Sequence, residues 1–131
     1  MKYKLLELAS VRSGDKNNIC NIGVLAKDSE AYSLLKKLLS AEKVKAHFGS
    51  LIKGKVVRYE WESIESLNFV CYEALDGGAS RSLRMDTLGK NFSSHIGVDL
   101  SKKMLILVGF SRLGKAMYSY GTRISFMVAL V

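Results

Sequence analysis

The feature that most constrains the fold is a polar stretch, residues 12–23, that lies between two apolar runs. The alternation before it predicts a strand over residues 3–12, and the apolar run after it predicts a strand over residues 21–27. Two strands this close in the sequence can pair antiparallel. We therefore expect a β-hairpin near the start of the chain, with a long polar loop as its connection.

The polar stretch has the composition of an anion site. Gly14 permits a positive φ angle, and Ser13 and Asp15 can bond to nearby backbone groups. Arg12 and Lys16 place two cations beside exposed N–H groups, which together form an anion-binding concavity. A tight connection with a solvated charge cluster explains the same residues, because loops rich in Gly, Asn and Asp are common. Both interpretations stay open at the level of the sequence.

The rest of the chain shows both helical and extended patterns. Apolar spacing predicts a helix over residues 29–39, a shorter one over 41–48 and a third strand over 56–61. Apolar residues at helical spacing predict another helix over 63–75, and alternation predicts a fourth strand over 81–86. The resulting order indicates an α+β sandwich, with a four-stranded sheet and two main helices on one face.

Composition narrows the class of protein. The chain has 131 residues and a net charge of +8, so nucleic acid, anionic ligands and acidic partners are candidates. Cys20 and Cys71 lack zinc-ligand spacing and fit a reducing compartment, so we expect a cytoplasmic protein without a metal or cofactor. No stretch has the ~18 apolar residues of a membrane-spanning helix. GxGxxG and GxxxxGK[ST], the fingerprints of nucleotide binding, are also absent.

Catalysis is an open question in the sequence. Asp15 or His47 is a candidate acid or base, and Lys16 is a candidate electrophilic stabiliser. No nucleophile–base pair is recognisable from the spacing, and a packed histidine near a helix end explains His47 equally. A small hydratase or isomerase is therefore kept as an alternative to a binding module.

RNA binding is a further alternative, because four-stranded α+β sheets with basic surfaces bind RNA. It predicts aromatic side chains on the open face of the sheet, and the middle of the first and last predicted strands has none. Half of the net charge also lies in residues 99–131, which hold five cations and one acid. We therefore expect no nucleic-acid partner.

Short segments along the chain resemble one known family in their order and spacing. They are RSGDK at 12–16, NIGVLA at 21–26, VKAHFG at 44–49, GKVVRYE at 54–60, LNFV at 67–70, EALDGG at 73–78, SLRMD at 82–86 and GK at 89–90. Over about residues 3–92 they resemble the AtuA-like domain family, named after the acyclic terpene utilisation protein AtuA. Residues 1–98 are therefore expected to form an AtuA-like domain with a ferredoxin-like α+β fold.

The resemblance also implies a function. The family's domain stands behind a larger domain in AtuA proteins and occurs as a small free-standing chain. The AtuA name comes from bacterial breakdown of acyclic terpenes such as citronellol and geraniol, a route that runs through CoA thioesters. The implied role is an accessory or binding subunit that acts with a larger AtuA-type subunit or as a homo-oligomer. The implied ligand is an acyl-CoA or another small anion.

The family's recurrent polar residues carry over to two groups of positions. The expected anion-binding or ligand-binding residues are Arg12, Ser13, Gly14, Asp15, Lys16, Asn21 and Arg81. The expected second loop consists of Asp76, Gly77 and Gly78, and the remaining carried-over positions are His47 and Asn68. Asn17 stands where the family usually has Gly.

Residues 99–131 do not resemble the family and mix cations with apolar runs. Three interpretations are open. The segment adds strands to the sheet, it is a surface that docks on a membrane or a partner, or it is a non-native end produced by a mis-predicted exon or a frameshift.

Overall fold

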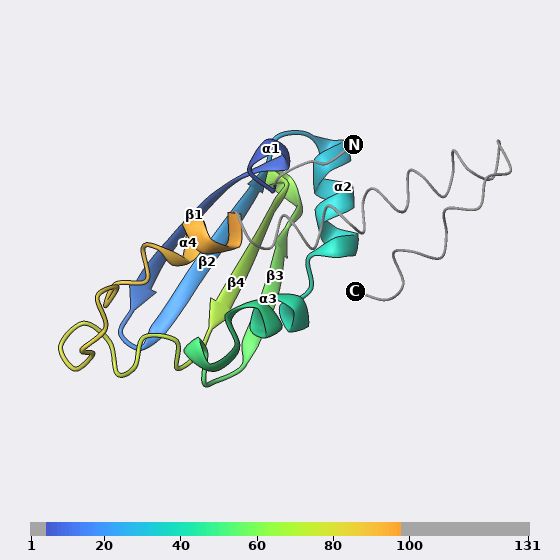
Figure 1. The fold of residues 1–131 in the computed structure, drawn as a ribbon. Helices are drawn as coiled ribbons and strands as arrows, with labels where there is room; N and C mark the ends of the chain where they lie inside the picture. Colours follow the sequence, from blue (N-terminus) through green and yellow to red (C-terminus); the bar gives the residue numbers. More distant parts are fainter. Residues whose placement is uncertain (1–4, 98–131) are drawn as a thin grey trace, which may run out of the picture.

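The computed structural model describes residues 5–97, which fold around a four-stranded antiparallel sheet of order β1-β2-β4-β3 (Figure 1). The interpretations of residues 99–131 lie outside the described residues. The strands are β1 (Ala9–Lys16), β2 (Ile19–Ala26), β3 (Val56–Trp61) and β4 (Ser66–Cys71). β1 and β3 form the two edges of the sheet, and the hairpins β1-β2 and β3-β4 meet where β2 pairs with β4.

Helices cover one face of this sheet. They are α1 (Leu5–Leu8), α2 (Ser29–Leu38), α3 (Ala41–Phe48) and α4 (Phe92–His95), with 3-10 turns η1 (Gly49–Leu51) and η2 (Glu62–Ile64). Figure 1 shows α4 crossing in front of β1 and β2, with α2 and α3 on the side of the other hairpin. The main elements follow the order ββα-ββα. This is the order of the β-α-β-β-α-β ferredoxin-like unit with its last strand moved to the front. The expected α+β fold, with two main helices, is confirmed.

The main helices begin where the sequence predicts, because each has a capping side chain. Asp28 Oδ1 accepts a hydrogen bond from Ala31 N at 2.7 Å and caps α2. Ser40 Oγ accepts one from Lys43 N at 3.3 Å and caps α3. The helices predicted over 29–39 and 41–48 are therefore confirmed, α2 ending one residue earlier.

The first hairpin differs from its prediction. β1 and β2 are joined by a two-residue turn, Asn17 and Asn18, so residues 12–16 lie in a strand and not in a loop. The residues before β1 form the short helix α1, whereas the sequence predicted a strand over 3–12. Polar residues fit into β1 because an edge strand buries only part of one face.

The prediction of a helix over residues 63–75 is wrong. This segment holds the end of η2, strand β4 and a following turn. Leu67, Phe69 and Cys71 are all fully buried, a period of two that fits a strand. The apolar spacing is compatible with a helix as well. The segment is a strand because its backbone pairs with both β2 and β3.

The prediction of a strand over residues 81–86 is also wrong. These residues lie in a long connection between β4 and α4 that passes the tip of the first hairpin (Figure 1). The backbone N–H groups of Arg81 and Ser82 both donate to the Gly78 carbonyl, which closes a local turn. Leu83 and Met85, expected on one face of a strand, are fully exposed.

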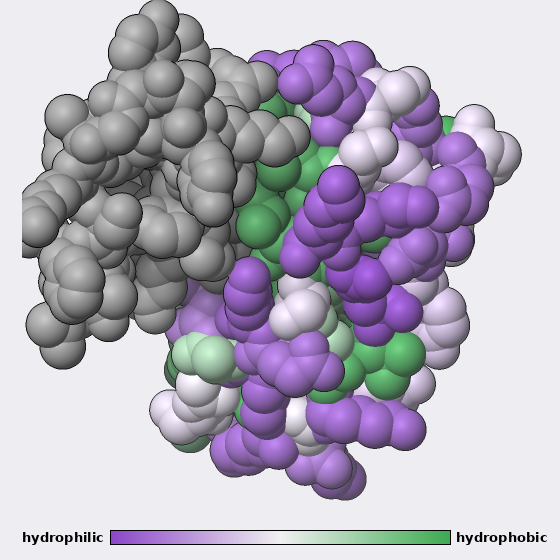
Figure 2. All heavy atoms as spheres, turned by 90° about the vertical axis from the view of Figure 1, so that its right-hand side faces the viewer, coloured by the Kyte–Doolittle hydropathy of each residue, from purple (hydrophilic) through white to green (hydrophobic). Residues whose placement is uncertain are grey.

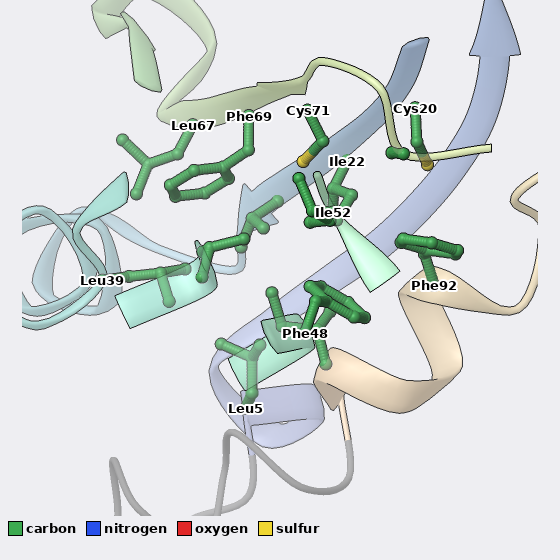
Figure 3. Close-up of a cluster of buried hydrophobic side chains, with 14 of the residues drawn as sticks. Leu5, Cys20, Ile22, Leu39, Phe48, Ile52, Leu67, Phe69, Cys71 and Phe92 are labelled. Atoms are coloured by element: carbon green, nitrogen blue, oxygen red, sulfur yellow. The ribbon is translucent and has the colours of Figure 1, made fainter. Parts of the chain in front are cut away.

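The core lies between the sheet and the helices (Figure 3). Ile22 of β2 and Phe69 of β4 are register partners on the covered face, and both are fully buried. Phe48 of α3 stacks on Phe92 of α4 with 4.7 Å between ring centroids, which ties the two ends of the helical layer together. In the view of Figure 2 the described surface is mainly hydrophilic. None of the helices within residues 5–97 has the length and apolarity to cross a bilayer.

Candidate functional site

The candidate site is the face of the sheet opposite the helices, which we call the outer face. Side chains alternate along a strand, so every second residue of each strand belongs to it. Its positions are Ser10, Arg12, Gly14, Lys16, Ile19, Asn21, Gly23, Leu25, Val57, Tyr59, Trp61, Ser66, Asn68 and Val70. None of these residues is acidic.

One edge of the outer face is basic. Arg12 and Lys16 are exposed, and they lie on either side of Gly14 along β1. Lys90 comes from the connection before α4, and its Nζ lies 3.2 Å from the point that a Cβ on Gly14 would occupy. Within residues 5–97, no carboxylate forms an ion pair with any of these three cations. We call Arg12, Gly14, Lys16 and Lys90 the basic edge.

The opposite edge is aromatic. Tyr59 and Trp61 occupy successive outer positions of β3, and their exposed fractions are 48% and 54%. Large aromatic rings that expose half their surface are typical of contact sites, since burial would remove a large apolar area from water. We call these two residues the aromatic edge.

The strand register places the two edges in line. Arg12 pairs with Gly23, Gly23 with Asn68, and Asn68 with Tyr59, so the four residues form one row across the sheet. Three strand spacings separate the edges, a distance of about 14 Å between backbones. Asn21 lies in the next row, opposite Gly14. The outer face therefore runs from cations through amides and glycines to aromatic rings.

The predicted loop residues separate between the two faces of the sheet. Arg12, Gly14, Lys16 and Asn21 belong to the outer face, whereas Ser13 and Asp15 lie on the covered face. Asp15 and Lys16 therefore project from opposite sides of β1. The catalytic pairing considered for them gains no support from this arrangement.

Ser13 contacts the backbone of Lys90 from the covered face of the sheet. Its Oγ donates to the Lys90 carbonyl at 3.0 Å and accepts from Ser93 N at 2.9 Å. Asp86 accepts from the backbone N–H groups of Lys90 and Asn91, both at 2.9 Å. These bonds hold the backbone of Lys90 beside β1. They give Ser13 a structural role.

The predicted second loop packs against the tip of the first hairpin. Asn18 Oδ1 accepts from Leu75 N at 3.2 Å and from Gly77 N at 2.9 Å. A Cβ on Gly78 would lie 2.6 Å from the Asn17 carbonyl oxygen, so only glycine fits there. The structure thus brings the two predicted loops together, through the Asn18 side chain and through backbone contacts.

Two charged residues of this second region differ in their contacts. Asp76 pairs with Lys53 at 2.7 Å, and this hydrogen bond and the positive charge lower the pKa of the Asp76 carboxyl. Arg81 is exposed just after the turn, where its N–H donates to the Gly78 carbonyl at 3.0 Å. Neither residue is part of the outer face.

His47 and the cysteines are not part of the outer face. His47 is on α3, which packs against β3, and its ring meets Phe48 edge-on at 4.8 Å. Cys20 and Cys71 are register partners on the covered face, and both are fully buried. Burial raises the pKa of each thiol to about 12, so neither is a nucleophile at neutral pH. Residues 5–97 contain no cluster of metal-ligating side chains.

Sequence reasoning missed three residues of the outer face: Tyr59, Trp61 and Lys90. The alternation at 56–61 already places both rings on one face of a strand, but the sequence does not tell which face is left open. Lys90 stands in the segment GK at 89–90, but the sequence does not show that it reaches Gly14, because the two meet only through the fold.

Comparisons with known proteins agree with the resemblance noted in the sequence. No curated protein and no solved structure matches this chain. The family model of the AtuA ferredoxin-like domain matches residues 3–100, which is most of the chain. The chain belongs to the family of AtuA ferredoxin-like domains.

Proposed function

We propose that this chain is a non-catalytic binding module that acts with a larger AtuA-type chain in the metabolism of acyl-CoA thioesters of acyclic terpenoids. Its ligand site is the outer face, and its place of action is the cytoplasm. The family membership supports an accessory role, and the outer face supports an anionic ligand.

The observation that carries this proposal is the basic edge. Arg12, Lys16 and Lys90 gather around Gly14 without a carboxylate partner among residues 5–97. An anion bound at this edge forms charge-assisted hydrogen bonds with these cations. The phosphate groups of CoA are such anions. The lack of a side chain at Gly14 lets the Lys90 ammonium approach the β1 backbone, since a Cβ there would lie 3.2 Å from Lys90 Nζ.

Calorimetry of octanoyl-CoA binding to the full chain tests the ligand. The Arg12→Ala/Lys16→Ala variant should bind at least tenfold more weakly, because it loses two of the three cations. The matched control is Lys27→Ala/Lys37→Ala, which removes the same charge from exposed positions outside the outer face. Equal weakening in both variants would show binding by net charge alone and would contradict the site.

Co-expression with an AtuA-type larger chain from the same source tests the partner. A single peak in size-exclusion chromatography that contains both chains is the expected result. Separate elution of the two folded chains at micromolar concentration would contradict the accessory role, whatever the outcome of the ligand experiment.

A further inference from the structure

We propose that the ligand of the outer face is a nucleotide, with its phosphates on the basic edge and its base on the aromatic edge. This inference rests on the proposed function, since it names the ligand class of the same face.

Charge complementarity indicates where the phosphates of the ligand bind. The strand positions of the outer face include no acid, and the two cations among them, Arg12 and Lys16, both lie on β1. Arg12 offers a planar fork of donors that matches phosphate geometry, while Lys16 and Lys90 add compact charges. A ligand with its anionic groups at one end fits this layout. A second copy of this chain does not, because face-to-face pairing would bring cations into a surface that has no acids.

The aromatic edge indicates where the base of the nucleotide binds. Tyr59 and Trp61 lie two residues apart on one face of β3, which separates their Cα atoms by about 7 Å. Both rings are about half exposed, and we place the base on Tyr59, which lies in the same row as Arg12, with Trp61 beside it. Every nucleobase has a π face, and stacking on Trp or Tyr is the common way in which an open sheet holds one.

The middle of the face distinguishes a nucleotide from a fatty carboxylate. Asn68 stands between Gly23 and Tyr59 in the central row, and Asn21 flanks that row. Amides need hydrogen-bond partners, which a ribose or the edge of a base provides and an alkyl chain does not. Among residues 5–97, none would lie closer than 3.9 Å to a Cβ on Gly23, so the described part of the chain leaves the centre of the row open to a ligand. The long side chains of both edges shorten the span of about 14 Å between the backbones.

Trp61 makes this inference measurable, because it is the sole tryptophan of the chain. We expect ADP to quench its fluorescence and to bind at least tenfold more tightly than adenosine or inorganic pyrophosphate. Calorimetry of Tyr59→Ala should show at least tenfold weaker ADP binding and unchanged pyrophosphate binding. Arg12→Ala/Lys16→Ala should weaken both. Leu83→Ala, which removes an exposed apolar side chain away from the outer face, should change neither.

Three results would overturn the proposal. One is pyrophosphate binding as tightly as ADP, and another is a Tyr59→Ala variant with a wild-type urea midpoint and wild-type ADP affinity. The third is an adenylate octanucleotide that binds far more tightly than ADP, which would assign the outer face to single-stranded nucleic acid. Trp61→Phe retains an aromatic ring and should retain ADP binding. This conservative variant can be measured even if the alanine variants impair folding.

The outcomes separate this inference from the proposed function. ADP binding without octanoyl-CoA binding, or without complex formation with the larger chain, would leave the nucleotide site standing and remove the proposed role. A complex with the larger chain, together with no ADP binding by the wild-type chain, would leave the accessory role standing and remove the nucleotide site.

Discussion

At the scale of single residues, the tip of the first hairpin shows how backbone contacts order a long connection. Asn18 holds the turn after β4 with its side-chain and backbone carbonyl groups, and Ala74 N donates to the Asn18 carbonyl at 3.0 Å. Asn17 adopts a φ of 57°, a left-handed conformation that asparagine tolerates better than most residues. Asn17 therefore closes the two-residue turn in this conformation although it is not a glycine.

Asn18→Ala should lower the free energy of unfolding by about 1–3 kcal/mol, because two backbone N–H groups lose their acceptor. Urea denaturation with a constant m-value measures this loss. Asn18→Asp retains the accepting oxygen and is the control, for which we expect a smaller loss. If both variants unfold at the wild-type midpoint, the two hydrogen bonds do not contribute to stability.

At the scale of elements, short-range signals determine the helices and long-range pairing determines the strands. α2 has an acidic N-cap and two lysines in its last turn. Each end of the helix therefore carries side-chain charges of the sign that its dipole favours. Arg58 of β3 then donates to the carbonyls of Lys36 and Leu39, both at 2.9 Å, and ties the end of α2 to the sheet. The sequence of α2 thus identifies the helix, and β3 fixes its position.

Asp28→Ala should destabilise the protein by about 0.5–2 kcal/mol through loss of the N-cap of α2. Asp28→Ser keeps a capping oxygen and should recover most of the loss. Thermal unfolding followed by far-UV circular dichroism measures both variants against the wild type. A Ser variant as unstable as the Ala variant would show that the charge of Asp28, and not its cap, is what matters.

At the scale of the whole molecule, the two faces of the sheet have opposite chemistry. The covered face carries the core, including the register pair Cys20 and Cys71, and the outer face carries the cations and aromatic rings. This division lets one small domain keep a buried core and still present cations and aromatic rings to solvent. The buried thiols also make its stability depend on pH.

The free energy of unfolding should fall between pH 9 and pH 12. In the unfolded chain the two thiols ionise near their ordinary pKa of 9.0, and in the folded protein burial raises each pKa to about 12. The unfolded state therefore binds fewer protons in this range, so stability decreases as pH rises. At pH 10 the expected loss is about 1 kcal/mol for each thiol.

Urea titrations at pH 8 and pH 10 check this dependence. The control is the Cys20→Ala/Cys71→Ala variant, which still contains the lysines and tyrosines that titrate in the same range. Its stability should decline less steeply than that of the wild type. Parallel declines would show that the thiols do not differ between the folded and unfolded states.

The sequence by itself determined α2, α3 and β3, because caps, periodicity and alternation are local properties of the chain. It also identified the family, through the order and spacing of its short segments. Only the tertiary structure decided that residues 66–71 are a central strand and that residues 12–16 divide between two faces. Apolar spacing in 63–75 fits both a helix and a strand, and the pairing partners of β4 lie far away in the chain. The register across β1, β2, β4 and β3 then placed Arg12 and Tyr59 in one row, since strand pairing sets which distant side chains share a face.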